Sequence, residues 1–183
     1  HLDPFTARGI EVLLLHDLMD GFMLNGLRDY EGLKLRNIDE AEIELPGEVE
    51  AAAPQVSDEQ FTLLAERATA LLGERLKEVR ASKVLRDSPA RLVSDDANRE
   101  MQRIQQLLGR ESEPQQRTLE LNPAHPLVAA LARRAEANAD DPVLADTLEQ
   151  LYDNALLLEG LHQNPAAMVP RLLKLMEAAA RTE

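Results

Sequence analysis

The chain has 183 residues and a formal net charge of −13, with 20 lysines and arginines against 33 aspartates and glutamates. This acidity argues against nucleic acid or an anionic membrane as the main partner, and the lack of cysteine excludes disulfides and thiolate metal sites. Hydrophobic residues form 44% of the sequence, enough for a core, and the abundant Leu, Ala, Glu and Arg favour helices. A reducing, cytoplasmic setting is expected.

The chain shows neither a membrane span nor a secretion signal. Its apolar runs fall short of the roughly 20 residues that a span needs, and no basic region precedes an apolar one at the start. Since the sequence begins HLDPFTARG without Met, we expect a piece of a longer chain.

Residues 1–45 have the pattern of a small α/β unit. A short helix is predicted first, with Pro4 in its first turn and Gly9 as its C-cap. The apolar run at 10–16 then predicts a buried strand. At 20–30 the signals conflict, because Asn25-Gly26 favours a hairpin while the apolar residues recur at helical spacing. We predict a helix there and a second strand at 32–38.

Residues 46–56 predict a linker, because the stretch around them combines prolines, a glycine and many acidic residues. Ser57 then caps a helix, with Gln60 at the capping-box position. Three strands are predicted within 76–85, 90–95 and 117–123, with a turn at 87–89. A further helix begins at Pro126 and ends near Asn138. Residues 57–183 therefore predict an α+β layer in which helices cover one face of a three-stranded sheet.

The last two predicted helices carry heptad-like apolar repeats. The final helix is apolar over a face broader than one partner helix covers, so we predict that two such hairpins form a four-helix bundle across a two-fold axis. The alternative is that the surplus face packs on the strands of its own domain. The predicted dimer interface consists of Leu144, Leu148, Leu151, Ala155, Leu158, Met168, Leu172, Leu175 and Met176.

No catalytic constellation stands out. The histidines are isolated from one another, and neither a HExxH motif nor a Gly-rich phosphate loop is present. His125, between two prolines, predicts a structural hydrogen bond. The acid pairs Asp95-Asp96 and Asp140-Asp141 precede predicted helices, where they compensate the helix dipole and supply caps.

Residues 97–108 predict a short amphipathic helix. Ala97, Met101, Ile104, Leu107 and Leu108 fall within an arc of about 120° on a helical wheel. This stripe either covers the strand layer or forms an exposed, Met-containing patch that can bind varied unfolded chains.

Phe22 poses a similar choice. It lies on the polar side of its predicted helix, so it either fills a neighbouring domain's crevice or binds a partner.

Four stretches resemble the bacterial heat-shock protein 90 chaperones, in that family's order: GIEVLLLHDLMDGFMLNGLRDYEGLKL, LLGERLKEVR, LELNPAHPLV and LYDNALLLEG. The resemblance implies that residues 1–45 end the family's middle domain and that residues 57–183 form its C-terminal dimerisation domain. It also implies that the ATPase domain, with its ATP and magnesium site, lies outside this chain. The fragment itself is then expected to be no enzyme and to hold no cofactor.

By the same resemblance, MQRIQQLLG matches an amphipathic helix that faces the client-binding cleft between protomers, with Met101, Ile104 and Leu108 at its apolar positions. Gln105 is polar where relatives can be aromatic. Phe22 matches an aromatic position that faces the same cleft. The resemblance favours the client-binding interpretation of Met101, Ile104, Leu107, Leu108 and Phe22.

The predicted function is therefore that of a chaperone fragment that forms homodimers and binds unfolded or partly folded client proteins. Co-chaperones are a further candidate class of partner. The alternative is a dimeric structural or adaptor module that binds no client, in which the helix at 97–108 belongs to the core.

Overall fold

The computed structural model describes residues 2–6, 8–15, 17, 19–27, 29–36, 55–93 and 116–181. The chain divides into two compact units, residues 1–50 and residues 51–183. The division falls within residues 46–56, where the sequence predicts a linker. Of that linker, only residues 55–56 are among the described residues.

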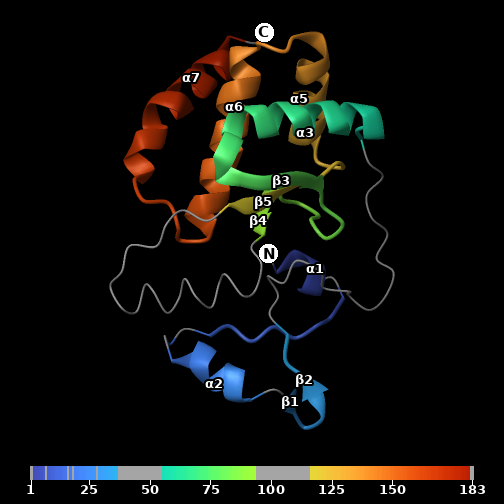
Figure 1. Cartoon of the computed structure of the whole chain (residues 1–183), viewed down its shortest axis with the longest axis vertical. Coiled ribbons are helices and arrows are strands. Elements are labelled where there is room, and N and C mark those ends of the chain that lie inside the picture. Colours follow the sequence, from blue (N-terminus) through green and yellow to red (C-terminus); the bar gives the residue numbers. More distant parts are fainter. Residues whose placement is uncertain are drawn as a thin grey trace. The chain divides into compact units, whose positions relative to one another are not determined.

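In its described residues, unit 1 contains two short helices and a two-stranded sheet (Figure 1). Helix α1 spans Asp3–Thr6, and Gly9 follows it with a φ of 63°, a left-handed conformation that glycine adopts without strain. Helix α2 spans Asp20–Gly26. Strands β1 (Asp29–Tyr30) and β2 (Leu33–Lys34) pair in antiparallel fashion. The helix predicted over 20–30 is thus confirmed for its first part, while Tyr30 belongs to a strand.

The strand predicted at 10–16 is wrong. Residues 10–15 have neither helical nor strand structure, and Leu13, Leu14 and Leu15 are exposed. Within the described part of unit 1, β1 and β2 pair only with each other. Among the described residues the segment has no neighbouring strand to satisfy its backbone groups, and an apolar run alone does not make a strand.

Unit 2 is built on a three-stranded mixed sheet. Strands β3 (Leu76–Ala81), β4 (Ala90–Val93) and β5 (Arg117–Leu121) match the three predicted strands. Their order is β3-β5-β4, with β5 parallel to β3 and antiparallel to β4. The two strands on either side of the predicted turn at 87–89 are therefore separated in the sheet by β5.

Four longer helices are described in this unit: α3 and α6 contact the sheet, α5 packs on α3, and α7 lies beside α6 (Figure 1). Helix α3 spans Asp58–Leu72 and has the predicted capping box: Ser57 Oγ accepts from the Gln60 amide, and Gln60 Oε1 accepts from the Ser57 amide. The short 3₁₀ helix η1 (Gly73–Arg75) follows it. Helix α5 spans Pro126–Ala137, as predicted. Helix α6 (Pro142–Leu158), the 3₁₀ helix η2 (Pro165–Met168) and helix α7 (Val169–Ala180) complete the unit.

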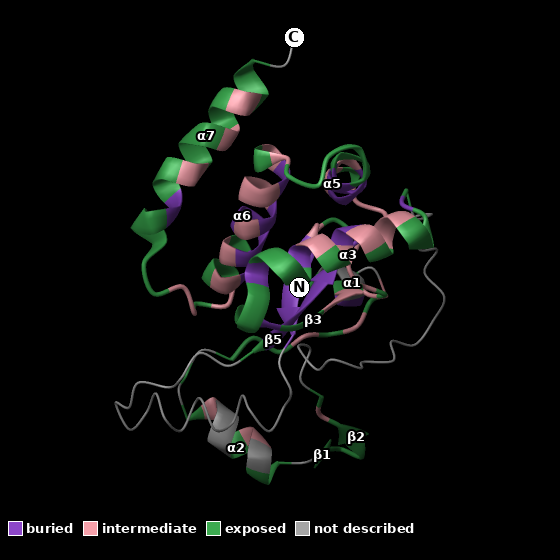
Figure 2. Cartoon of the chain, turned by 45° about the horizontal axis from the view of Figure 1, so that its top comes forward, coloured by how far each residue is buried: buried purple, intermediate pink, exposed green. Residues whose placement is uncertain are grey.

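The core of unit 2 lies where α3, α5 and α6 meet the sheet. Helix α3 packs on β3 and α5, and α6 packs on β4. Buried residues are concentrated in β4 and β5 and on α5 and α6, whereas α7 is largely exposed (Figure 2). The largest side chains sealed in this core are Leu64, Leu72, Leu119, Leu121, Val128, Leu131 and Leu148.

Candidate functional site

Helix α7 has two distinct sides. The residues shielded from solvent recur at spacings of three, four and three: Met168, Arg171, Leu175 and Ala178. Arg171 bonds to side chains of α6, so this side faces α6. Because Met168 is buried while the other three are only half-buried, α7 lies at the edge of the unit.

The other side of α7 carries an exposed apolar surface, which we call the outer stripe: Val169, Leu172, Leu173 and Met176. Leu173 keeps 55% of its surface exposed and Met176 keeps 65%. Leu157 and Leu158, at the end of α6 where the chain turns toward α7, are exposed as well, Leu158 to 74%. Single exposed apolar residues are ordinary, but a continuous apolar helix face indicates a contact surface.

The structure revises which predicted interface residues are available to a second copy. Those on α6 that form the heptad repeat lie in the chain's own core, at 5% exposure or less: Leu144, Leu148, Leu151 and Ala155. They stabilise the fold of one chain and offer a partner almost no surface. Met168 is buried too, and Leu175 is half-buried. The predicted residues that remain exposed are Leu158, Leu172 and Met176.

The structure also regroups the apolar residues of the last helix. By spacing, Leu172 pairs with Met168 and Leu175, but in the structure it belongs with Val169, Leu173 and Met176 on the exposed side. On the side of α7 that faces α6, Arg171 lies between Met168 and Leu175. Hydrophobicity alone could not find this arrangement, because a charged residue occupies the middle of the side that faces α6.

The predicted client-binding residues lie mostly outside the described part of the chain. Met101, Ile104, Leu107 and Leu108 all fall within residues 94–115, which the structure does not describe. Phe22 belongs to α2, but its side chain is likewise outside the description. On the same helix Met23 is exposed, as is Met19 just before it. Unit 1 thus presents methionine side chains to solvent next to the position of Phe22.

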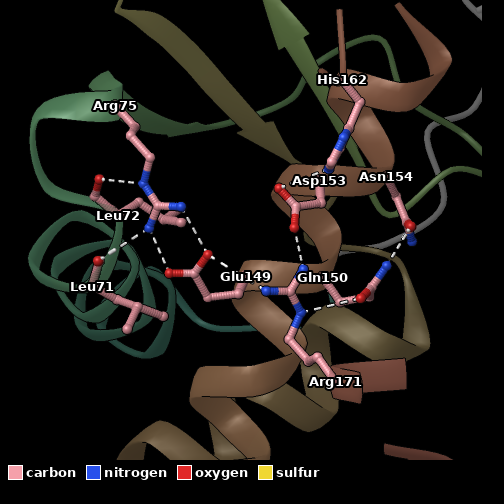
Figure 3. A network of polar contacts seen from close by, with 9 residues as sticks. All are labelled: Leu71, Leu72, Arg75, Glu149, Gln150, Asp153, Asn154, His162 and Arg171. Atoms are coloured by element: carbon pink, nitrogen blue, oxygen red, sulfur yellow. Dashed lines mark hydrogen bonds and ion pairs between the residues drawn. The ribbon is translucent and has the colours of Figure 1, made fainter. Parts of the chain in front are cut away.

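A polar network joins α7 to α6 and to the end of α3 (Figure 3). Arg171 Nε donates to Gln150 Oε1 at 3.1 Å, and its guanidinium pairs with the Asp153 carboxylate and lies 3.9 Å from Glu149 Oε2. Gln150 Nε2 in turn donates to Asn154 Oδ1 at 2.8 Å. Periodicity gave no signal for this network, because its members are polar residues spread over 97 positions of the chain, from 75 to 171.

Glu149 connects Arg171 with Arg75. Arg75 Nη1 donates to Glu149 Oε2 at 2.8 Å, while Arg75 Nε donates to the Leu72 carbonyl at 3.0 Å. The guanidinium carbon of Arg75 also lies 5.3 Å from the ring centroid of Tyr152, a cation–π distance. The hydrogen bond with Glu149 raises the pKa of Arg75, outweighing the lowering by burial. Arg75, in η1, therefore connects the end of α3 with Glu149 of α6.

The sheet contains a second charged cluster around Glu120. This residue is directly opposite Arg80 in β3 and Arg91 in β4. Arg80 Nη2 donates at 2.8 Å and Arg91 Nε at 2.7 Å to the two carboxylate oxygens. Arg80 Nε adds a bond at 2.9 Å and Ser82 Oγ another at 3.0 Å. Burial raises the pKa of Glu120, but the bonds and charges of Arg91 and Arg80 outweigh it, so the pKa is lowered. This cluster holds the three strands together.

The isolated histidines and acids have structural roles where they are described. His125 caps α5, its Nδ1 accepting from the Leu127 amide at 3.1 Å, which confirms the predicted structural hydrogen bond. Asp141 caps α6 by accepting from the Val143 amide at 2.8 Å, also as predicted. Asp95 and Asp96 lie outside the described residues.

Across the described ranges, no group of three or more histidine and acidic side chains could hold a metal ion. Within the same stretches, no helix combines the length and the apolar character needed to cross a lipid bilayer.

Comparison with known proteins places the chain in a family. Residues 1–183 match the family described as Hsp90 protein. A relative from Oleidesulfovibrio alaskensis, named chaperone protein HtpG, is 34% identical over a region covering 98% of this chain and 30% of that protein. Proteins of the same name from Pasteurella multocida and Mycobacterium avium are 36% and 38% identical, covering 96% and 87% of this chain. The chain belongs to the Hsp90 family.

The chain spans about 30% of the length of the first of these relatives, and 28% and 26% of the other two. The match to the Hsp90 family confirms the family resemblance that the sequence indicates.

Proposed function

We propose that this chain is the dimerising and client-binding portion of an Hsp90-type chaperone. The observation that carries the proposal is the outer stripe of α7, which exposes four large apolar side chains; Leu157 and Leu158 at the end of α6 are exposed as well. Removing such a surface from water is the main driving force of protein association, and a two-fold axis lets the same stripe serve both partners.

In this proposal the dimer is a mechanical link. Two copies joined through α7 keep two chaperone arms at high effective concentration, so that events elsewhere in the longer protein act within one assembly. ATP hydrolysis would belong to the part of the relatives that this chain does not cover.

Clients would bind by apolar contact to adaptable, methionine-containing surfaces. The candidates are the predicted stripe of Met101, Ile104, Leu107 and Leu108 together with Phe22. Their binding would be weak at each site and doubled by the dimer.

Dimerisation is tested by charging the outer stripe. We expect the double variant Leu172→Asp with Met176→Asp to weaken the dimer by at least about 100-fold, because the change occurs twice in a symmetric interface. The matched control is Lys174→Asp, which adds the same charge of −2 to an exposed position on another side of α7. Light scattering over a dilution series should give about 41 kDa, twice 20.4 kDa, for wild type and control. A mass of one chain for the wild type at every dilution would contradict the proposal.

Client binding is tested separately in the full-length protein. Met101→Asp with Ile104→Asp should lower protection of an aggregating client while the dimer stays intact. The control, Gln102→Asp with Gln106→Asp, changes the opposite side of the predicted helix. Equal protection by both variants would instead support the adaptor module without client binding.

A further inference from the structure

The contact between α6 and α7 is polar where a helix hairpin is usually apolar. Met168, just before α7, is buried, but Leu175 and Ala178, on the side of α7 that faces α6, are only half-buried. Arg171 occupies the middle of this side. Apolar burial here is therefore small, and other interactions must hold α7 in place.

Arg171 supplies those interactions. Its guanidinium reaches Gln150, Asp153 and Glu149, one turn of α6, with its side chain only 19% exposed. Partial burial strengthens ion pairs relative to the same contacts in water, and a planar guanidinium that binds several acceptors fixes direction as well as distance. Figure 3 shows Arg171 inserted among these side chains of α6.

Both acidic partners of Arg171 are themselves anchored. Glu149 also binds Arg75, which is bonded to the Leu72 carbonyl at the end of α3. Asp153 Oδ1 lies 3.5 Å from Nε2 of His162, in the loop that leads to α7. The Arg171 site is thus continuous with the end of α3 on one side and with the loop before η2 on the other.

We propose that Arg171 is a positioning residue that fixes α7 on α6 within each chain, so that the outer stripe is preorganised before a second copy binds. This inference rests on the proposed dimerisation through the outer stripe. It adds that the affinity of the dimer depends on the contact of Arg171 with α6. Arg171 lies on the side of α7 opposite the stripe and binds α6 of its own chain, so it would orient the helix from within each protomer.

The expected effect on assembly follows from the fraction of chains whose α7 is in place. If loss of Arg171 lowers that fraction to about one third in each protomer, the apparent dissociation constant rises by roughly ten-fold, because both copies must be competent. Preorganisation of this kind changes affinity without adding a contact at the interface.

The first experiment uses the monomeric background Leu172→Asp with Met176→Asp and measures amide hydrogen exchange in α7. We expect α7 to remain protected in this background and to lose about ten-fold in protection when Arg171→Met is added. The matched control is Arg181→Met, which removes an equally long basic side chain from the exposed pair with Glu177 on the same helix and should leave protection unchanged. Arg171→Lys, which keeps the charge but not the planar reach to three partners, should restore only part of it.

The second experiment measures dimer affinity in the otherwise wild-type chain. Arg171→Met should weaken the dimer by about ten-fold and Arg181→Met by less than about two-fold. Equal α7 protection with and without Arg171, or no protection of α7 in the monomer, would overturn the inference. So would loss of protection spread equally over α5 and the sheet, since Arg171 would then stabilise the whole unit.

The two proposals fail in different ways. If the wild-type chain is monomeric at every dilution, the dimer proposal fails while hydrogen exchange still decides whether Arg171 holds α7. If the chain is dimeric and the protection of α7 against hydrogen exchange is the same with and without Arg171, only the proposed positioning role of Arg171 is refuted.

Discussion

Helices α6 and α7 follow each other in the chain and both carry heptad-like apolar repeats, but they use them differently. Helix α6 buries Leu144, Leu148, Leu151 and Ala155 against the sheet and the neighbouring helices. Helix α7, all of whose residues are described, has none that is buried and turns an apolar side to solvent. The same pattern thus serves the interior of one chain in α6 and, in our proposal, the contact between two chains in α7. A repeat shows that a helix has an apolar side, but not what covers it.

The largest expected effect separates the two repeats directly. Leu148→Ala in α6 should lower the free energy of unfolding by about 4 kcal/mol, because the side chain is 1% exposed and its loss leaves a cavity. Urea unfolding followed by circular dichroism measures the change. A loss below about 1 kcal/mol would mean that α6 is not part of the core.

Arg91→Met tests the charged cluster in the sheet on which α6 packs. We expect a loss of about 3 kcal/mol in unfolding free energy, because the buried Glu120 would lose one of the two charged partners that it has among the described residues, Arg80 and Arg91. Arg133→Met, at an exposed position of α5, is the control and should change stability by less than about 0.5 kcal/mol. Equal effects of the two variants would refute a role for the cluster.

The charged cluster around Glu120 should also make the stability of the fold depend on pH in the acid range. The pKa of Glu120 is lowered in the folded chain, so its stabilising contribution is present above the unfolded value of about 4.3 and is lost as the pH falls through the folded pKa. Stability measured from pH 6 down to pH 2 should fall less steeply in Glu120→Gln than in wild type. Parallel curves would contradict the assignment.

The caps of the two helices sharpen the comparison further. Asp141 caps α6, whereas Met168 precedes α7 without a side-chain cap. Asp141→Ala should cost about 1 kcal/mol of unfolding free energy. Asp141→Asn, which keeps the cap but loses the ion pair with Arg134 at 2.7 Å, should cost less. An equal cost for both would assign the effect to the ion pair.

The smallest effect on folding is expected at the outer stripe. Leu173→Ala in the monomeric background should change the free energy of unfolding by less than about 0.5 kcal/mol, because the side chain is already 55% exposed. It is the matched counterpart of Leu148→Ala. A cost comparable to that of Leu148→Ala would show that α7 belongs to the core and would remove the distinction between the helices.

Much of unit 2 could be predicted from local patterns. The capping box of Ser57 and Gln60, the three strands, and the helix that begins at Pro126 all follow from short-range rules, and the structure confirms them. The strand predicted at 10–16 failed because a strand needs a neighbour, which local pattern cannot supply. The order of the strands in the sheet, with β5 between β3 and β4, could not be predicted from local patterns either, since it depends on pairing between distant segments.

The apolar residues of the outer stripe could be predicted in part from the sequence, but the position of Arg171 could not. The sequence shows that the last helix is too apolar for one partner, and Leu172 and Met176 are indeed exposed. It could not show that Arg171 lies among the apolar residues on the side toward α6, because the acceptors on α6 lie about 20 positions earlier in the chain.

By itself, the sequence determined the family, the α+β class, the helix boundaries marked by caps and prolines, and the presence of apolar sides on α6 and α7. These features depend on neighbouring residues or on short sequence motifs. Only the tertiary structure decided which apolar side is core and which is surface, and that Glu149 and Asp153 bind Arg171. Burial and ion pairing depend on which distant segments meet in space, and the period of a helix carries no information about that meeting.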